Sequence, residues 1–195
     1  MKYNLSEING VIRERRSIKP ENFSTRTVHR EIIENMLENA RWAPTHGMTQ
    51  PWHFVVFTEE GRRKFADYQQ QTYKKTTSPD SFVEAKFNQL GERPLCASAV
   101  IAITMKRQDI EKIPEVEEVE AVACAVQNMM LTATAYGIGA YWSSGGFTYT
   151  DGMKAFLGLS DKDKCLGFLY IGYPEGEWPK SQRRPIDTFT RWEEK

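Results

Sequence analysis

Residues 98–104 read Ser-Ala-Val-Ile-Ala-Ile-Thr, and this stretch decides the fold. A short apolar run without polar alternation is typical of a strand that is buried on both faces. A second run over 164–172 predicts another core strand. Shorter strands are expected within 50–57, which is aromatic and β-branched after its proline, and at 138–142. The chain is therefore built around a sheet with packed layers against it.

Helices are predicted between these strands and before them. An apolar stripe with helical spacing precedes Pro20, and the first helix should end at 16–17 because proline cannot continue it. Thr25 or Thr27 is expected to cap a second helix, which ends before Pro44.

The longest predicted helix runs over about 115–136 and is rich in alanine. It fits a central core helix and one half of a dimer interface equally well. Residues 59–75 and 81–90 also have helical character, and the region 59–95 fits either a mobile lid or a fixed helical hairpin.

Asp151 is expected to cap a short helix that Gly158 closes. Because helices and strands do not alternate strictly, the pattern favours an α+β fold. We expect a central mixed sheet of about four to five strands flanked by helices, in a single domain spanning 1–195. The charged, proline-containing segment at about 174–195 predicts an extended C-terminal arm.

Composition excludes several classes of function. The chain has 26 basic and 26 acidic residues, so nothing in its net charge favours nucleic acid. Its apolar runs are too short to span a membrane, and Glu7 and the charged 13–16 cluster are incompatible with a signal peptide, so we expect a cytoplasmic protein. The three cysteines and three histidines lack the spacing of a disulfide framework or a metal site, so no metal is expected.

Known nucleotide motifs are also absent from the sequence. There is no GxGxxG after a strand, no GxxxxGK[ST] and no GxSxG. Arg15-Arg16-Ser17, however, puts two guanidiniums and a hydroxyl at a bend, where they can bind a phosphate or carbonyl oxygens. Cations at a helix C-terminus can also do no more than satisfy the helix dipole.

Four segments in order carry a family likeness over essentially the whole chain. They are 15–17, then 43–54 (Ala-Pro-Thr-His-Gly-Met-Thr-Gln-Pro-Trp-His-Phe), then 137–145, and lastly 169–174 followed by Arg183-Arg184-Pro185. Together they resemble the nitroreductase superfamily, and most closely its compact subgroup of YdjA-type NAD(P)H nitroreductases. This resemblance implies an FMN-dependent homodimer with the flavin sites at the subunit interface.

The resemblance also implies a set of cofactor-binding residues. Arginines would hold the phosphate, Ser17 the ribityl chain, and the turn after Trp142 the hydride-accepting edge of the ring. Lys19 would place positive charge near the reduced ring. The implied set is Arg15, Arg16, Ser17, Lys19, His46, Trp142, Ser143, Ser144, Gly145, Arg183 and Arg184.

The implied activity is hydride transfer from NAD(P)H to FMN, followed by reduction of a small acceptor such as a nitro compound or a quinone in a ping-pong mechanism. No catalytic side chain is required, because the flavin carries the chemistry. Met48 and His46 depart from many larger relatives, which leaves the acceptor open. The alternatives are a flavin-dependent dehalogenase or oxidative enzyme of the same fold, a non-catalytic FMN-binding protein, and a protein-interaction module without a cofactor.

Overall fold

The computed structural model describes residues 2–194 and is built on one four-stranded sheet. Its strands are β1 (Trp52–Phe57), β2 (Ala99–Met105), β3 (Gly139–Ser143) and β4 (Lys164–Gly172), in the order β1-β2-β4-β3. All three ladders are antiparallel. Parallel pairing among the described residues is confined to an isolated bridge between Ser17 and Ala140. The expected α+β fold and number of strands are confirmed, but the sheet is antiparallel and not mixed, because the parallel contact at Ser17 does not extend into a strand.

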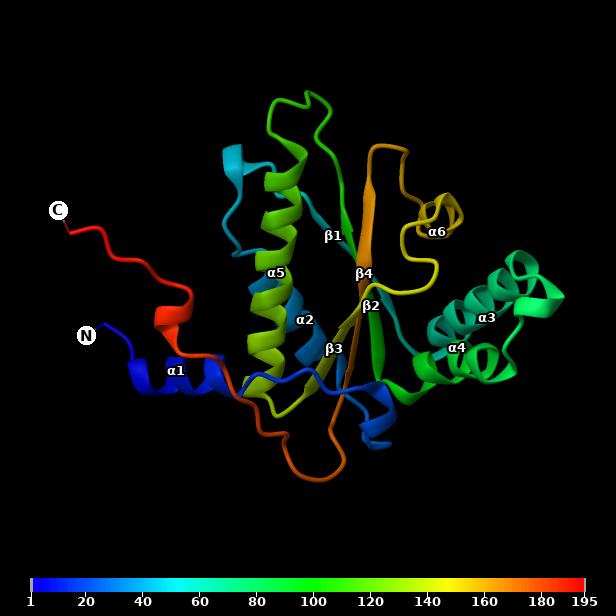
Figure 1. Cartoon of the computed structure of the whole chain (residues 1–195), viewed down its shortest axis with the longest axis horizontal. Coiled ribbons are helices and arrows are strands. Elements are labelled where there is room, and N and C mark those ends of the chain that lie inside the picture. The colour runs from blue at the N-terminus through cyan, green and yellow to red at the C-terminus, as the bar shows by residue number, and fades with distance from the viewer. Residues whose placement is uncertain (1, 195) are drawn as a thin grey trace.

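Strand β2 is buried along its whole length, because helices cover both faces of the sheet (Figure 1). Its side chains alternate between two apolar clusters, as the twofold periodicity of a strand requires. Ile101 and Ile103 pack with α2 (Arg30–Ala40) and α5 (Glu115–Ala135) on one face. Val100 and Ala102 pack on the other face with Phe65, Met153 and Leu157, which belong to α3 (Glu59–Thr76) and to α6 (Asp151–Phe156) with its C-cap.

Helix α5 is the core helix of the first layer. Its buried residues follow helical spacing: Glu118, Ala121, Val122, Ala125, Val126, Met129, Met130 and Ala133. The only charged member, Glu118, accepts hydrogen bonds from Arg107 and, at 3.2 Å, from Gln108 Nε2. The Arg107 and Glu118 side chains are only 9% and 1% exposed, so this ion pair ties the loop before α5 to the helix.

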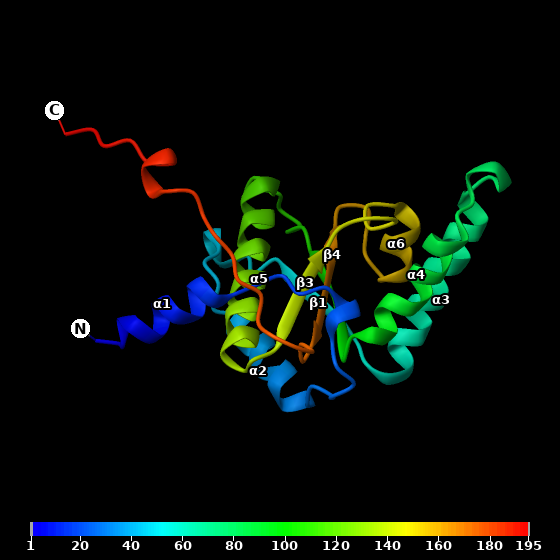
Figure 2. The same ribbon diagram turned by 60° about the horizontal axis from the view of Figure 1, so that its bottom comes forward.

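Helix α4 (Glu84–Cys96) packs against α3 in an antiparallel hairpin (Figure 2). At its tip the buried Tyr73 hydroxyl accepts the N–H of Val83 at 3.0 Å. At its base Arg93 pairs with Glu21 in the short helix Pro20–Asn22, with 2.6 Å between Nη2 and Oε1. These contacts favour the fixed hairpin over the mobile lid for residues 59–95.

Two predicted helix starts were wrong. Helix α2 begins at Arg30 after His29, not at a cap by Thr25 or Thr27, because the N–H of buried Val28 donates to Ser98 Oγ and keeps the preceding chain extended. Helix α6 is capped by Thr150, whose hydroxyl accepts the N–H of Met153, so that Asp151 is its first residue.

Helix α1 (Leu5–Glu14) and the arm after Pro174 project from the same side of the molecule (Figures 1 and 2). No residue of α1 is buried, and Leu5, Ile8 and Ile12 are 49%, 44% and 51% exposed. The arm includes the short helix Ile186–Thr188 and is exposed over most of its length. Within residues 2–194, no helix combines the length and the apolar character needed to cross a membrane.

Candidate functional site

A surface hollow of about 430 Å³ lies where the chain leaves α1 and passes between α5, β3 and β4. A guanidinium and the hydroxyls of two serines share it with a methionine, a leucine, a tryptophan and a tyrosine. Its lining residues are Arg15, Ser17, Met130, Trp142, Ser144, Tyr149 and Leu166. Four of the eleven predicted site residues therefore come together: Arg15, Ser17, Trp142 and Ser144.

The backbone after α1 explains why Arg15 and Ser17 line the hollow without Arg16. Arg15 leaves the helix with an extended conformation (ψ 125°), and Ser17 forms the parallel bridge with Ala140. The N–H of Ile18 then donates to the Ala140 carbonyl at 3.0 Å. Side chains alternate along an extended segment, so Arg15 and Ser17 share one side and Arg16 points to the other.

Arg16 forms hydrogen bonds away from the hollow through its Nε and Nη1 atoms. Its Nη1 donates to the carbonyls of Arg13 at 2.6 Å and of Arg15 at 2.9 Å, and its Nε donates to the Pro179 carbonyl at 2.8 Å. The position of Arg16 therefore does not support the predicted contact with a cofactor.

Trp142 is held in place by a backbone irregularity in β4. Its indole N–H donates to the Leu166 carbonyl at 3.0 Å, next to Gly167, whose φ is +124°. The register between β2 and β4 shifts at this point. A Cβ on Gly167 would lie 2.6 Å from both Ser143 O and Trp142 Nε1, so only glycine fits here. The bulge thus fixes the indole against Leu166 as one wall of the hollow.

The turn after β3 brings exposed backbone beside this wall. Ser143 is the last paired residue of β3, opposite Phe168, and its side chain does not line the hollow. Ser144 lines it, and the Gly145 carbonyl accepts the Thr148 hydroxyl at 2.8 Å. A Cβ on Gly145 would meet nothing within 4 Å. The predicted close approach at Gly145 would therefore have to be to a bound molecule.

Positive charge gathers at the Arg15 end of the hollow. Burial lowers the pKa of Arg15, and the nearby charges of Arg183 and Arg16 lower it further. Arg184, in contrast, stacks over Phe189, with its Cζ 4.9 Å from the ring centre. Lys19 is exposed at the start of the next short helix and does not line the hollow.

His46 lies apart from this group, at the other end of α5. It belongs to the short helix His46–Met48, and its Nδ1 is 2.5 Å from Glu117 Oε2. Glu117 precedes Met130, which lines the hollow, by thirteen helical positions. At 1.5 Å per residue that is roughly 20 Å along the axis. Within one chain His46 does not join the hollow.

The segment around His46 has a strained backbone. Gly47, Met48 and Gln50 have φ values of +57°, +56° and +47°, in the left-handed region that non-glycine residues rarely adopt. Thr45 holds this shape, because its Oγ1 accepts the N–H of Gln50 at 3.1 Å and lies 3.2 Å from Thr49 Oγ1. Strain of this kind clusters at functional sites, which favours a role for this segment in binding.

A larger hollow of about 670 Å³ lies at the outer edge of β1, between the starts of α2 and α3. None of the predicted site residues lines it, and its charged groups include both Arg30 and Glu34, which form an ion pair. Its chemistry therefore gives no reason to prefer it to the hollow at Arg15.

Comparison with known proteins identifies the family of this chain. The sequence profile of the Nitroreductase family matches residues 12–173. The chain belongs to this family. The Escherichia coli (strain K12) protein named "Putative NAD(P)H nitroreductase YdjA" is 33% identical over 145 residues, which is 74% of this chain and 77% of that protein. Family membership makes the chain an oxidoreductase of the FMN type in general.

Solved structures share the fold over nearly the full length. The nitroreductase-like family protein from Bacillus cereus superposes with a TM-score of 0.79 at 28% identity, covering 98% of this chain and 97% of that one. A Desulfovibrio desulfuricans protein described as a "putative nitroreductase in complex with fmn" has a TM-score of 0.70 at 24% identity, covering 98% of both chains.

Three residues of the hollow could not be recognised from sequence. Met130 belongs to an apolar helical stripe that predicts only core, and Leu166 lies within a core strand. Tyr149 follows the small-residue turn and is exposed in the structure. An aromatic residue in a loop was the one sequence signal that could have pointed to it.

Proposed function

We propose that this chain is a single-domain FMN-dependent oxidoreductase that takes a hydride from NAD(P)H and reduces a small acceptor, such as a nitro compound or a quinone, in a ping-pong mechanism. The observation that carries the proposal is the hollow in which Arg15, Ser17 and Ser144 adjoin Trp142 and Leu166. When bound, FMN supplies the hydride and electron transfer.

The residues of the hollow fit a phosphorylated flavin. A guanidinium at one end suits a phosphate, and the positive charge of Arg183 reinforces it. The hydroxyls of Ser17 and Ser144 suit a polyol chain, while Trp142 and Leu166 offer apolar contact to a ring system. The volume of about 430 Å³ lies within the usual range of cofactor sites.

In this proposal the chain's own residues bind the flavin, orient it and exclude water from it. Trp142 and Met130 cover one side of the hollow with apolar surface, which removes water from a bound ring. The free backbone at Gly145 lets N–H groups approach the edge of that ring closely, because no side chain intervenes. No side chain needs to act as acid, base or nucleophile.

We further propose that the working unit is a homodimer with a flavin site at each interface. Helix α1 leaves Leu5, Ile8 and Ile12 uncovered beside the hollow, and an apolar stripe of this kind calls for a partner surface. The hollow is open on one side, and the strained segment at His46 lies too far away to close it within one chain. A second copy would supply that segment, so His46 and Lys19 remain proposed cofactor residues.

The first test is the protein as purified. It should be yellow, should carry about one FMN per chain, and should elute as a dimer. A colourless monomer that takes up no added FMN would contradict the proposal and would favour a fold relative without a cofactor.

The second test addresses turnover. Anaerobic stopped-flow mixing with NADH or NADPH should bleach the flavin absorbance quickly, and nitro compounds or quinones should restore it. Flavin that neither nucleotide reduces would contradict the reductase and leave a non-catalytic flavin-binding protein. Acceptor screening on photoreduced protein should include halogenated phenols, since release of halide would identify a reductive dehalogenase instead.

A further inference from the structure

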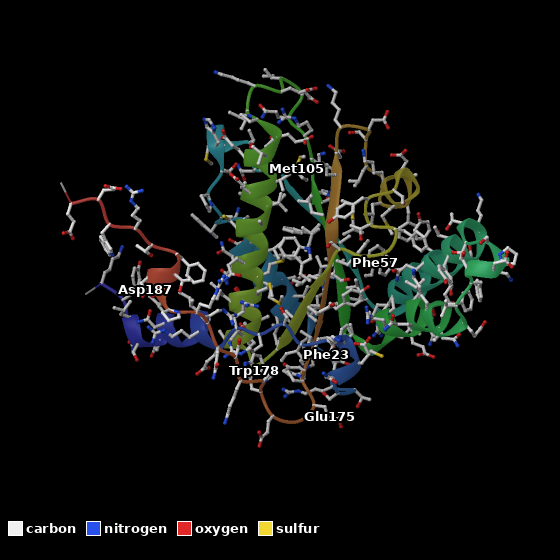
Figure 3. All side chains as sticks on the ribbon, in the orientation of Figure 1. Phe23, Phe57, Met105, Glu175, Trp178 and Asp187 are labelled. Carbon is white, nitrogen blue, oxygen red and sulfur yellow. The ribbon has the colours of Figure 1, made fainter. Side chains whose placement is uncertain are left out.

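The C-terminal arm is anchored to the end of α1 by two side chains. The Trp178 indole N–H donates to the Glu14 carbonyl at 2.7 Å, and Arg16 Nε donates to the Pro179 carbonyl at 2.8 Å. Both views show the arm passing this end of α1, and Figure 3 labels Trp178 there. We call the pair Arg16 and Trp178 the arm anchor.

The arm anchor also completes the C-terminus of α1. The last carbonyls of a helix have no partner within the helix, and they need donors from elsewhere. Trp178 serves the carbonyl of Glu14, while Arg16 serves those of Arg13 and Arg15. Two of these bonds, from Trp178 to Glu14 and from Arg16 to Pro179, join the arm to the helix end, and these two fix the path of the arm.

Fixing the arm at Pro179 limits where Arg183 can lie. Arg183 is four residues further on, so fully extended chain allows at most about 14 Å between them. The Pro179 carbonyl is bound by Arg16, which is adjacent to Arg15 in the sequence. Burial lowers the pKa of the Arg15 guanidinium most, and the nearby charge of Arg183 is one of two that lower it further. Two like charges held together in this way are stabilised by an anion between them.

We propose that Arg16 and Trp178 are positioning residues that hold Arg183 beside Arg15, and that the two held arginines select a flavin bearing a phosphate over one without it. Arg16 itself does not touch the ligand. The inference rests on the proposed flavin function and assigns to Arg16 a role different from that of a phosphate ligand. It also assigns a role to Trp178, which no sequence motif singles out.

The experiment compares FMN with riboflavin, which lacks the phosphate. Dissociation constants of both are measured by fluorescence titration of the apoprotein for the wild type and for Arg16→Ala, Trp178→Phe and the double variant. Each single variant should weaken FMN binding by about tenfold or more, the loss expected for one charge-assisted hydrogen bond. Riboflavin affinity should stay unchanged. The double variant should lose little more than the single variants, because both act through the same arm.

Arg13→Ala is the matched control. Arg13 is an exposed arginine in the last turn of α1, and only its backbone carbonyl takes part in the arm anchor. Its removal should leave both affinities unchanged. Trypsin cleavage after Lys180 or Arg183 provides a second readout, and it should be faster in Arg16→Ala and Trp178→Phe than in Arg13→Ala.

Two results would overturn the inference. If Arg16→Ala weakens FMN binding while Trp178→Phe leaves it unchanged, Arg16 is a direct phosphate ligand. If both variants release the arm to trypsin but keep the wild-type ratio of FMN to riboflavin affinity, the arm takes no part in selecting the phosphate. Failure of the proposed function is a different result, since the wild-type apoprotein would then bind neither flavin.

Discussion

Replacing Gly167 by alanine should damage both the sheet and the proposed flavin site. Its φ of +124° lies in a region that essentially only glycine occupies. The new methyl group would lie 2.6 Å from Ser143 O, which is backbone, and 2.6 Å from Trp142 Nε1. The indole can yield by giving up its bond to the Leu166 carbonyl, but the Ser143 carbonyl can move only with the end of β3.

The expected cost follows from these two effects. A residue forced into this part of conformational space costs about 1–3 kcal/mol. Overpacking a well-filled site adds about 1–3 kcal/mol. Together they amount to roughly 2–6 kcal/mol, a large share of the 5–15 kcal/mol that is typical of a whole domain.

Urea unfolding of the apoprotein measures this loss, and Gly158→Ala is the matched control. Gly158 also has a positive φ, +67°, but a Cβ there would meet nothing within 4 Å. Its replacement should cost only about 1–2 kcal/mol, the price of the left-handed conformation. Indole fluorescence and FMN affinity should change in Gly167→Ala and stay constant in Gly158→Ala.

Equal losses of free energy of unfolding in the two glycine variants would show that the contacts of Gly167 are irrelevant. A Gly167→Ala variant that is strongly destabilised yet binds FMN with unchanged affinity would show that the bulge does not shape the hollow.

Three further predictions concern polar and charged groups. Arg15→Ala should weaken FMN binding by about tenfold or more. Ser17→Ala should weaken it by about fivefold or less, because a neutral hydrogen bond contributes only about 1 kcal/mol. Equal losses of FMN affinity in a titration of the two variants would contradict this order. Glu118→Ala leaves the buried Arg107 without its partner and should cost about 3–5 kcal/mol in urea unfolding, so a loss below 1 kcal/mol would refute the importance of that ion pair. Burial alone would raise the pKa of Asp163, but hydrogen bonds from the N–H groups of Ser160 and Arg107 outweigh it and lower the pKa. Its contribution to stability is therefore complete above the unfolded pKa of about 4 and is lost as pH falls through the folded pKa, so Asp163→Asn should flatten the acid limb of a plot of stability against pH.

Sequence was sufficient for the elements whose signal is local. The run at 98–104 predicted β2 because a fully buried strand has no polar alternation, and the strand at 164–172 was predicted with the bounds that the structure has. Pro44 and Gly158 marked chain breaks for reasons that belong to their own backbones. The start of α2 was missed because a distant hydroxyl, that of Ser98, decides it.

The candidate site also combines residues that the sequence predicts with contacts that it does not. Arg15, Ser17, Trp142 and Ser144 were found through a family likeness, and the structure brings them to one hollow. The likeness treated Arg15 and Arg16 as equivalent. Their separation depends on the Ser17–Ala140 bridge, a contact across more than a hundred residues that no local pattern contains.

The distance between His46 and the hollow has a genetic consequence. If each flavin site takes Arg15 from one copy and His46 from the other, a defect in either residue should be complemented in trans. A dimer of one Arg15→Ala copy and one His46→Ala copy would contain one site with both defects and one intact site. At an FMN concentration too low to saturate either variant, unfolding and refolding the two together should therefore give more activity than the mean of the two variants measured separately.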